Sequence, residues 1–192
     1  AKKALGRYFL FLDADMKLPR QLISECVAVI EKGRANAVII PETTLGKSFF
    51  AQIKKLEKRL YLGEEVIEAA RFFSKQVFFN AGGYDEKLIA GEDWDLSQRV
   101  VQLGKVVRIA TPLYHYETSF LRELRHKIYY ARKIREYARI HPQRFALQSG
   151  TARLHLFWRK KKLFISQPLE AVGLFFLKGF EYGLYRLLTF IS

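Results

Sequence analysis

Two short apolar segments separated by a helical pattern constrain the fold most strongly. Residues 7–12 (RYFLFL) and residues 36–41 (NAVIIP) have the length and apolar content of buried strands. Between them, Pro19 begins a segment with apolar residues at helical spacing, and Gly33 ends it. A strand, a helix and a strand of these lengths predict a β–α–β unit, which is typical of parallel sheets. We therefore expect an α/β fold.

Later segments extend this pattern. We expect helices where apolar side chains recur every three or four residues, at 48–62, 93–103 and 119–140. We expect strands at 69–74 and 105–109, and a short helical segment that leads up to Gly82 and Gly83. The chain has 192 residues, enough for one hydrophobic core. We divide it into an α/β portion, 1–117, and a helical extension, 118–192.

Two local features bear on context. Cys26 is the single cysteine, which excludes an internal disulfide and a zinc site built from cysteines, and its helical position predicts a buried thiol. The first residues, AKKALGR, resemble the end of a helix and its turn rather than a secretory signal. They predict that the chain begins inside a domain.

Positive charge is concentrated in one part of the chain. Residues 117–162 contain thirteen lysine and arginine residues against three acidic ones, a net +10 of the chain's +14. Such a segment attracts phosphate-rich partners, either nucleic acid or the anionic headgroups of a bilayer. The alternative, a solvated helix face, would contain more interleaved acidic residues.

The C-terminal segment, 168–192, is very apolar, but four charged residues interrupt it: Glu170, Lys178, Glu181 and Arg186. At 100° per residue these four fall within about 160° of a helical wheel. A helix crossing a bilayer would place them in hydrocarbon, whereas a helix in the interface keeps them in water. We therefore expect an interfacial amphipathic helix, with a helix docked on a partner protein as the alternative.

Two carboxylates, Asp13 and Asp15, lie one residue apart just after the first predicted strand, in the motif FLDAD. Mg²⁺ and Mn²⁺ take oxygen ligands, commonly one or two carboxylates together with substrate phosphates. Taken alone the motif is weak, because turns and helix caps also use aspartate.

A second acidic group lies in residues 78–100, FFNAGGYDEKLIAGEDWDLSQRV. Gly82 and Gly83 permit a backbone turn and a close approach by a ligand. Glu92 and Asp93 begin an amphipathic helix, where acids also stabilise the helix dipole. Three acids within four residues, around Trp94, exceed what helix capping requires.

Four segments in this order and spacing, FLDAD, FFNAGGYDEKL, GEDWDLSQRV and LYHYE, resemble the family 2 inverting glycosyltransferases of GT-A fold. The resemblance covers about residues 4–137. It implies a partial GT-A, Rossmann-like sheet with flanking helices, followed by basic and amphipathic C-terminal helices. The part of the family that grips the nucleotide base precedes these motifs and is absent from this sequence.

The resemblance also implies roles for individual residues. Asp15 would hold a Mn²⁺ or Mg²⁺ ion that bridges the donor diphosphate, and Asp13 would contact the ribose or the metal. Glu92 and Asp93 match the acidic pair of the family, with Asp93 as the general base. His115 falls where some relatives supply another metal ligand, although a histidine satisfied by the backbone is an equal alternative.

The remaining predicted substrate contacts are Gly82, Gly83, Asp85, Trp94 and Arg71. Trp94 would stack on an apolar sugar face, and a core role remains open for Trp94 and Arg71. Residues 148–153 (QSGTAR) do not reproduce the Gln-x-x-Arg-Trp element of processive synthases, and the sequence contains no bundle of spanning helices. Both observations favour transfer of a single sugar.

The sequence thus predicts a metal-dependent glycosyltransferase at the cytoplasmic face of a membrane, peripheral or monotopic. Its donor would be a UDP- or GDP-linked sugar, and its acceptor a glycan or a lipid-linked molecule near an anionic membrane surface. Nucleic acid is not an expected partner in this interpretation. The alternatives are a basic nucleic-acid-binding module and a non-catalytic remnant of a glycosyltransferase.

Overall fold

The computed structural model describes residues 1–190, which form two compact units. Unit 1 comprises residues 1–43, 63–87 and 91–115. Unit 2 comprises residues 44–62, 88–90 and the chain from residue 116 onward. The chain combines helices with two small sheets, so the predicted mixed α/β character is confirmed.

Unit 1 contains a four-stranded sheet in the order β1 (Tyr8–Leu10), β5 (Ala70–Ser74), β3 (Ala37–Ile39), β6 (Val106–Arg108). β3 and β6 are parallel, whereas β5 is antiparallel to both β1 and β3. The expectation of a parallel sheet is therefore wrong in part. β1 and β3 do run in the same direction, but β5, from later in the sequence, lies between them.

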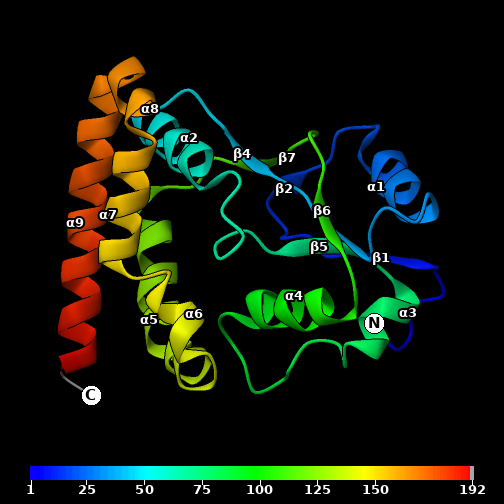
Figure 1. Ribbon diagram of the computed structural model, residues 1–192. Helices are drawn as coiled ribbons and strands as arrows, with labels where there is room; N and C mark the ends of the chain where they lie inside the picture. Colours follow the sequence, from blue (N-terminus) through cyan, green and yellow to red (C-terminus); the bar gives the residue numbers. More distant parts are fainter. Residues whose placement is uncertain (191–192) are drawn as a thin grey trace. The chain divides into compact units, whose positions relative to one another are not determined.

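Helices cover both faces of this sheet (Figure 1). α1 (Leu22–Glu31) lies on one face, where Leu22 and Cys26 pack with Val38. α3 (Lys75–Asn80) and α4 (Glu92–Leu103) lie on the other, where Leu96 packs with residues that include Ile39. Successive residues of β3 thus point to opposite faces, as expected for a strand buried on both sides.

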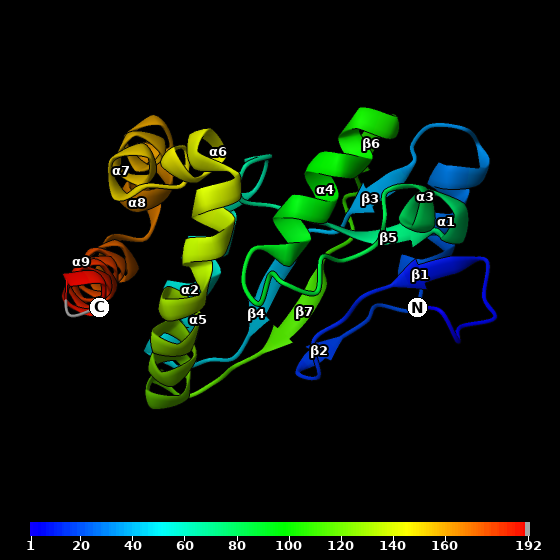
Figure 2. The same ribbon diagram turned by 90° about the horizontal axis from the view of Figure 1, so that it is seen from below.

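A three-stranded sheet has the order β2 (Met16–Lys17), β7 (Leu113–Tyr116), β4 (Glu42–Leu45) (Figure 2). β2 and β7 are antiparallel, with Met16 opposite His115. Two of the boundaries between unit 1 and unit 2, after residues 43 and 115, fall within β4 and β7. This pairing places His115 beside the residues that follow the FLDAD motif.

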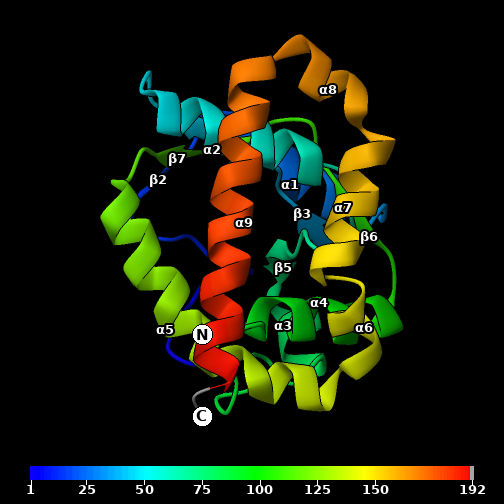
Figure 3. The same ribbon diagram turned by 90° about the vertical axis from the view of Figure 1, so that its left-hand side faces the viewer.

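Unit 2 is helical in its described part: α2 (Phe49–Tyr61), α5 (Phe120–Ile140), α6 (Pro142–Ala146), α7 (Gly150–Arg159), α8 (Lys161–Ser166) and α9 (Pro168–Phe190). The hydroxyls of Ser48, Ser119 and Ser149 accept backbone N–H groups at the starts of α2, α5 and α7. α9 crosses α2, with α5 and α7 on either side (Figure 3). α2 therefore groups with the C-terminal helices, although it lies inside the 1–117 portion defined from the sequence.

Six charged residues, two from each of three helices, form an ion network in unit 2 that is buried except at Lys127, whose side chain is 41% exposed: Lys54 and Glu57 (α2), Glu123 and Lys127 (α5), Lys178 and Glu181 (α9). Lys178 pairs with Glu57 and lies 2.7 Å from Glu181. The side chains of Lys178 and Glu181 are only 15% and 14% exposed. The expectation that these two charges lie in water is therefore wrong, because α2 and α5 supply their partners.

Two further expectations concern the N-terminal part and the membrane. Residues 1–7 contain a turn, closed by the Ala4 N–H on the carbonyl of Ala1, and a bend before β1 rather than the end of a helix. Cys26 is fully buried as expected, and this burial raises the pKa of its thiol to about 12. None of the helices within residues 1–190 combines the length and apolar character needed to cross a bilayer.

Candidate functional site

Polar residues converge at one edge of the four-stranded sheet. β1 and β3 end at this edge, and β5 begins there because it runs the opposite way. Asp13 follows β1, Glu42 follows β3, and Arg71 is the second residue of β5. The Arg71 guanidinium donates from Nη2 to Glu42 Oε1 (2.7 Å) and to Asp13 Oδ2 (3.2 Å). The topology thus explains why residues distant in the sequence meet.

Arg71 is the positive centre of this acidic group. Its side chain is 22% exposed. Burial alone would lower the pKa of Arg71, but Glu42, Asp13 and Asp93 outweigh burial and raise it. Arg71 therefore stays charged and partly neutralises the carboxylates around it.

Glu92 and Asp93 form the first turn of α4, which Gly91 begins with a left-handed backbone (φ +80°). Burial raises the pKa of Asp93, while the backbone N–H of Trp94 (2.8 Å from Oδ1) and the charge of Arg71 oppose the rise. Burial also raises the pKa of Glu92, and the neighbouring Asp93 and Asp13 add to this effect. Two carboxyl groups with raised pKa values beside an arginine favour a role in proton transfer.

The start of α4 is fixed next to the start of β5. The indole N–H of Trp94 donates to the carbonyl of Ile67 (2.8 Å), and the hydroxyl of Ser97 accepts the N–H of Ala70 (2.8 Å). The Ile67 contact occupies the indole N–H of Trp94, the residue predicted to stack on a sugar. We infer that Trp94 positions Asp93 relative to Arg71.

The Gly82–Gly83 turn is held by an ion pair whose carboxylate is buried. Both glycines have left-handed backbones, with φ +83° and +68°. The Arg99 guanidinium donates to the carbonyls of Ala81 and Gly83 and pairs with the buried Asp95 carboxylate (2.5 Å). Asp95 therefore has a structural role that accounts for one acid of the GEDWD motif.

Asp85, which the sequence places among the substrate contacts, lies just after this turn. Its Oδ1 accepts the backbone N–H of Lys87 (2.9 Å), which closes a local turn. This contact explains an aspartate at this position without a ligand. A substrate contact by Asp85 stays a prediction.

Asp15 and His115 form a second, smaller group. His115 Nε2 lies 3.6 Å from Asp15 Oδ1, with side chains 25% and 37% exposed. Within residues 1–190, no three histidine, cysteine or acidic side chains gather as a ready metal site. Because Mg²⁺ and Mn²⁺ usually take one or two carboxylates beside substrate phosphates, the Asp15 carboxylate fits such an ion bound together with a diphosphate, whereas the His115 imidazole is a less suited ligand.

The structure adds Glu42 and Tyr84 to the candidate site. Glu42 could have been found from the sequence, since it follows a buried strand as Asp13 does. Tyr84 packs edge-on against Phe11 (4.8 Å between ring centroids), and burial, followed by Asp93, raises the pKa of its phenol. No sequence signal distinguishes Tyr84 from other aromatic residues.

A comparison with models of known protein families found no match, and a comparison with curated protein sequences found no similar protein. The functional interpretation therefore depends on the motifs and on the geometry described above.

Proposed function

We propose that this chain is the catalytic part of a metal-dependent, inverting glycosyltransferase that moves a single sugar from a nucleotide-sugar donor to a membrane-associated acceptor. One observation carries the proposal. Arg71 joins Asp13 and Glu42 at the sheet edge, and the raised pKa of Asp93 responds to the same guanidinium. An inverting transfer needs a base for the acceptor hydroxyl and, separately, groups that stabilise the charge of the leaving diphosphate.

In the proposed reaction, Asp93 accepts the proton of an acceptor hydroxyl. At the same time the oxygen of that hydroxyl bonds to the anomeric carbon of the sugar. The bond from that carbon to the diphosphate breaks, and the nucleoside diphosphate leaves. The backbone N–H of Trp94 and the charge of Arg71 favour the ionised form of Asp93 and oppose the effect of burial, which raises the Asp93 pKa. Glu92, the preceding residue in the first turn of α4, is the second acid of the proposed pair.

Asp15 and His115 are the residues that would hold Mn²⁺ or Mg²⁺, with Asp13 contacting the ribose or the metal. When bound, the ion supplies neutralisation of charge on the departing diphosphate. The backbone N–H groups of Gly82 and Gly83 donate to Phe79 and Phe78, so a substrate contact at this turn rests on the resemblance alone. Relation to the GT-A fold is part of this proposal and rests on the four motifs named above.

A transfer assay tests the proposal. Purified protein with Mn²⁺ and UDP- or GDP-sugars should release nucleoside diphosphate when acceptors are added, and the product should have the inverted anomeric configuration. Asp93→Asn should abolish transfer to hydroxyl acceptors, and Glu86→Gln, an exposed acid in the nearby loop, is the matched control. Equal activity of Asp93→Asn and Glu86→Gln would refute Asp93 as the base.

Nucleic-acid binding is the second candidate, favoured by the net +10 of residues 117–162. This second candidate does not explain why Asp13, Glu42 and Asp93 gather around Arg71. A salt-sensitive mobility shift with RNA or DNA, together with no affinity for nucleoside diphosphates, would reverse the ranking.

A further inference from the structure

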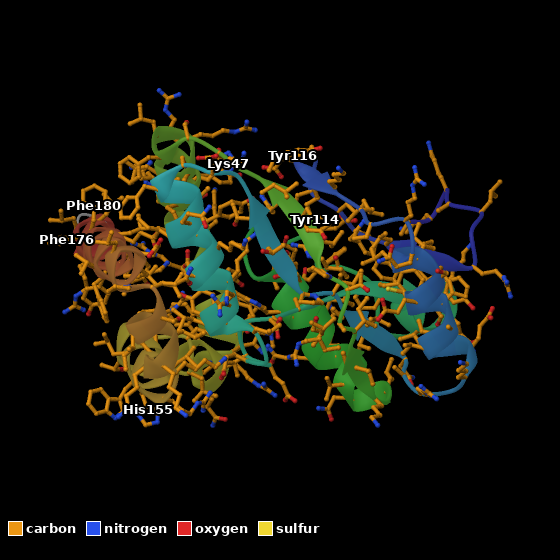
Figure 4. The ribbon with its side chains drawn as sticks, turned by 90° about the horizontal axis from the view of Figure 1, so that it is seen from above. Lys47, Tyr114, Tyr116, His155, Phe176 and Phe180 are labelled. Carbon is orange, nitrogen blue, oxygen red and sulfur yellow. The ribbon has the colours of Figure 1, made fainter. Side chains whose placement is uncertain are left out.

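α9 presents an apolar stripe on its exposed side. Five residues, each more than half exposed, recur along the helix: Leu169, Val172, Phe176, Phe180 and Leu187. At 100° and 1.5 Å per residue they occupy a band about 80° wide and about 27 Å long. Phe176 is 77% exposed, and Phe176 and Phe180 project from the side of α9 away from α2 (Figure 4). We call these five residues the outer stripe.

The buried ion network fixes which side of α9 faces outward. Lys178 and Glu181 lie about 100–180° from the outer stripe on the helical wheel. They pair with Glu57 and Lys127, and Leu174 and Ala171 are buried beside them. Rotating α9 to hide the stripe would break these ion pairs in a poorly hydrated interior, which is costly. The stripe is therefore held on the surface of unit 2.

The charge of unit 2 favours an anionic bilayer as the partner of the stripe. The stripe belongs to a unit whose residues 117–162 have a net charge of +10. A second copy would bring the same charge and be repelled, whereas anionic headgroups are attracted. Trp158, 71% exposed, has the Lys161 ammonium 4.8 Å from its ring centroid, and Arg186 lies 5.9 Å from the ring of Tyr182. Aromatic residues beside cations are typical of membrane interfaces.

We propose that the outer stripe of α9 is a membrane-docking surface that inserts between the headgroups of an anionic phospholipid bilayer while α9 lies along the interface. This inference rests on the membrane part of the proposed function and specifies which residues make the contact. It reverses the arrangement expected from the sequence, because charges in the ion network anchor α9 to the protein and aromatic residues meet the lipid. Helices that lie in an interface insert about 5–10 Å.

Vesicle co-sedimentation tests the proposal without donor or acceptor, so its outcome is independent of the transfer activity. The probes are vesicles of phosphatidylcholine alone and of phosphatidylcholine with an equal amount of phosphatidylglycerol. The test variant is Phe176→Ser with Phe180→Ser, and the matched control is Val101→Ser with Leu103→Ser, two exposed apolar residues of α4 in unit 1. Each buried phenylalanine contributes roughly tenfold to partitioning, so the test variant should bind about 100-fold more weakly.

We expect the wild type and the control to bind the anionic vesicles more tightly than the neutral ones. Thermal unfolding of each variant checks folding, and Val172→Ser with Leu187→Ser is a second test variant. Binding of both test variants like the wild type would overturn the proposal, as would a wild type that binds neither vesicle. A wild-type dimer in sedimentation velocity that the test variants dissociate, without vesicle binding, would instead assign the stripe to a second copy.

Discussion

Glu57 is the residue whose charge the buried ion network needs most. Its side chain is 5% exposed, and it accepts from Lys54 Nζ (2.6 Å) and pairs with Lys178. Burial alone would raise the pKa of Glu57, but Lys178, Lys54 and Lys127 outweigh it and lower the pKa well below its usual value. The six charges of the network balance, so Glu57→Gln leaves one positive charge in excess where water is scarce.

We expect Glu57→Gln to destabilise unit 2 by about 3 kcal/mol. Removing one partner of a buried ion pair costs about 3–5 kcal/mol, and glutamine retains one acceptor, which favours the lower value. For a chain of this size the corresponding fall in Tm is roughly 6–12 °C. Far-UV circular dichroism during urea and thermal unfolding measures both, because unit 2 supplies most of the helix.

The matched control is Glu136→Gln, because Glu136 and Arg139 form an i, i+3 pair on the exposed face of α5. Its unfolding midpoint should not change measurably, since exposed ion pairs contribute little. A second comparison is Glu57→Met with Lys178→Met, which removes one charge of each sign. This double variant should lose less than the sum of its two single variants. If Glu57→Gln unfolds at the same midpoint as Glu136→Gln, the argument from the ion network is refuted.

Three further outcomes follow from the structure. The stability that Glu57 contributes depends on its lowered pKa in the folded state. This stability should be present above about pH 4.3, the ordinary pKa of a glutamate, and be lost as the pH falls through the lowered folded-state pKa. Urea unfolding between neutral and acid pH should show the difference in unfolding free energy between wild type and Glu57→Gln shrinking. Asp95→Asn should destabilise unit 1 by roughly 2 kcal/mol, because Arg99 then lacks its buried carboxylate while still holding Ala81 and Gly83; an unchanged Tm would contradict this. If Asp93 is the base, the acid limb of the transfer rate should lie above 3.8, the ordinary pKa of the group, because Asp93 is protonated as the pH falls through its raised value. Arg71→Met should move that limb to higher pH, and an acid limb that stays at the same pH in Arg71→Met would exclude Asp93 as the titrating group.

Local patterns in the sequence identified most of the helices and strands correctly. Apolar periodicity predicted helices at 48–62, 93–103 and 119–140, and the structure has α2, α4 and α5 there. Periodicity indicates which residues share a face but not which strands pair. The insertion of β5 between β1 and β3 depends on hydrogen bonds between segments about 30 to 60 residues apart, so the mixed sheet was not predicted.

The orientation of α9 also depends on contacts with distant segments, which a local sequence pattern does not indicate. The helical wheel placed four charged residues of α9 on one side, but only Lys178 and Glu181 join the ion network, and Arg186 is exposed. Solvent was the partner assumed for Lys178 and Glu181. Their actual partners, Glu57 and Lys127, lie more than 50 residues away on α2 and α5. In the candidate site, Asp13 and Asp93 were identified from their motifs, whereas the role of Arg71 as a bridge required the position of Glu42.

The most direct test of the proposed function is binding of UDP and GDP, titrated by calorimetry with and without Mn²⁺, to the wild type and to Asp15→Asn. Glu86→Gln serves as the control, since it removes an exposed negative charge of unit 1 outside the Asp15–His115 pair. We predict that one of the two nucleotides binds the wild type and the control only with Mn²⁺, and that Asp15→Asn loses this binding. The proposal that this chain holds a metal-dependent donor site would be contradicted if a nucleotide bound equally well without Mn²⁺ and to Asp15→Asn. It would also be contradicted if neither nucleotide bound.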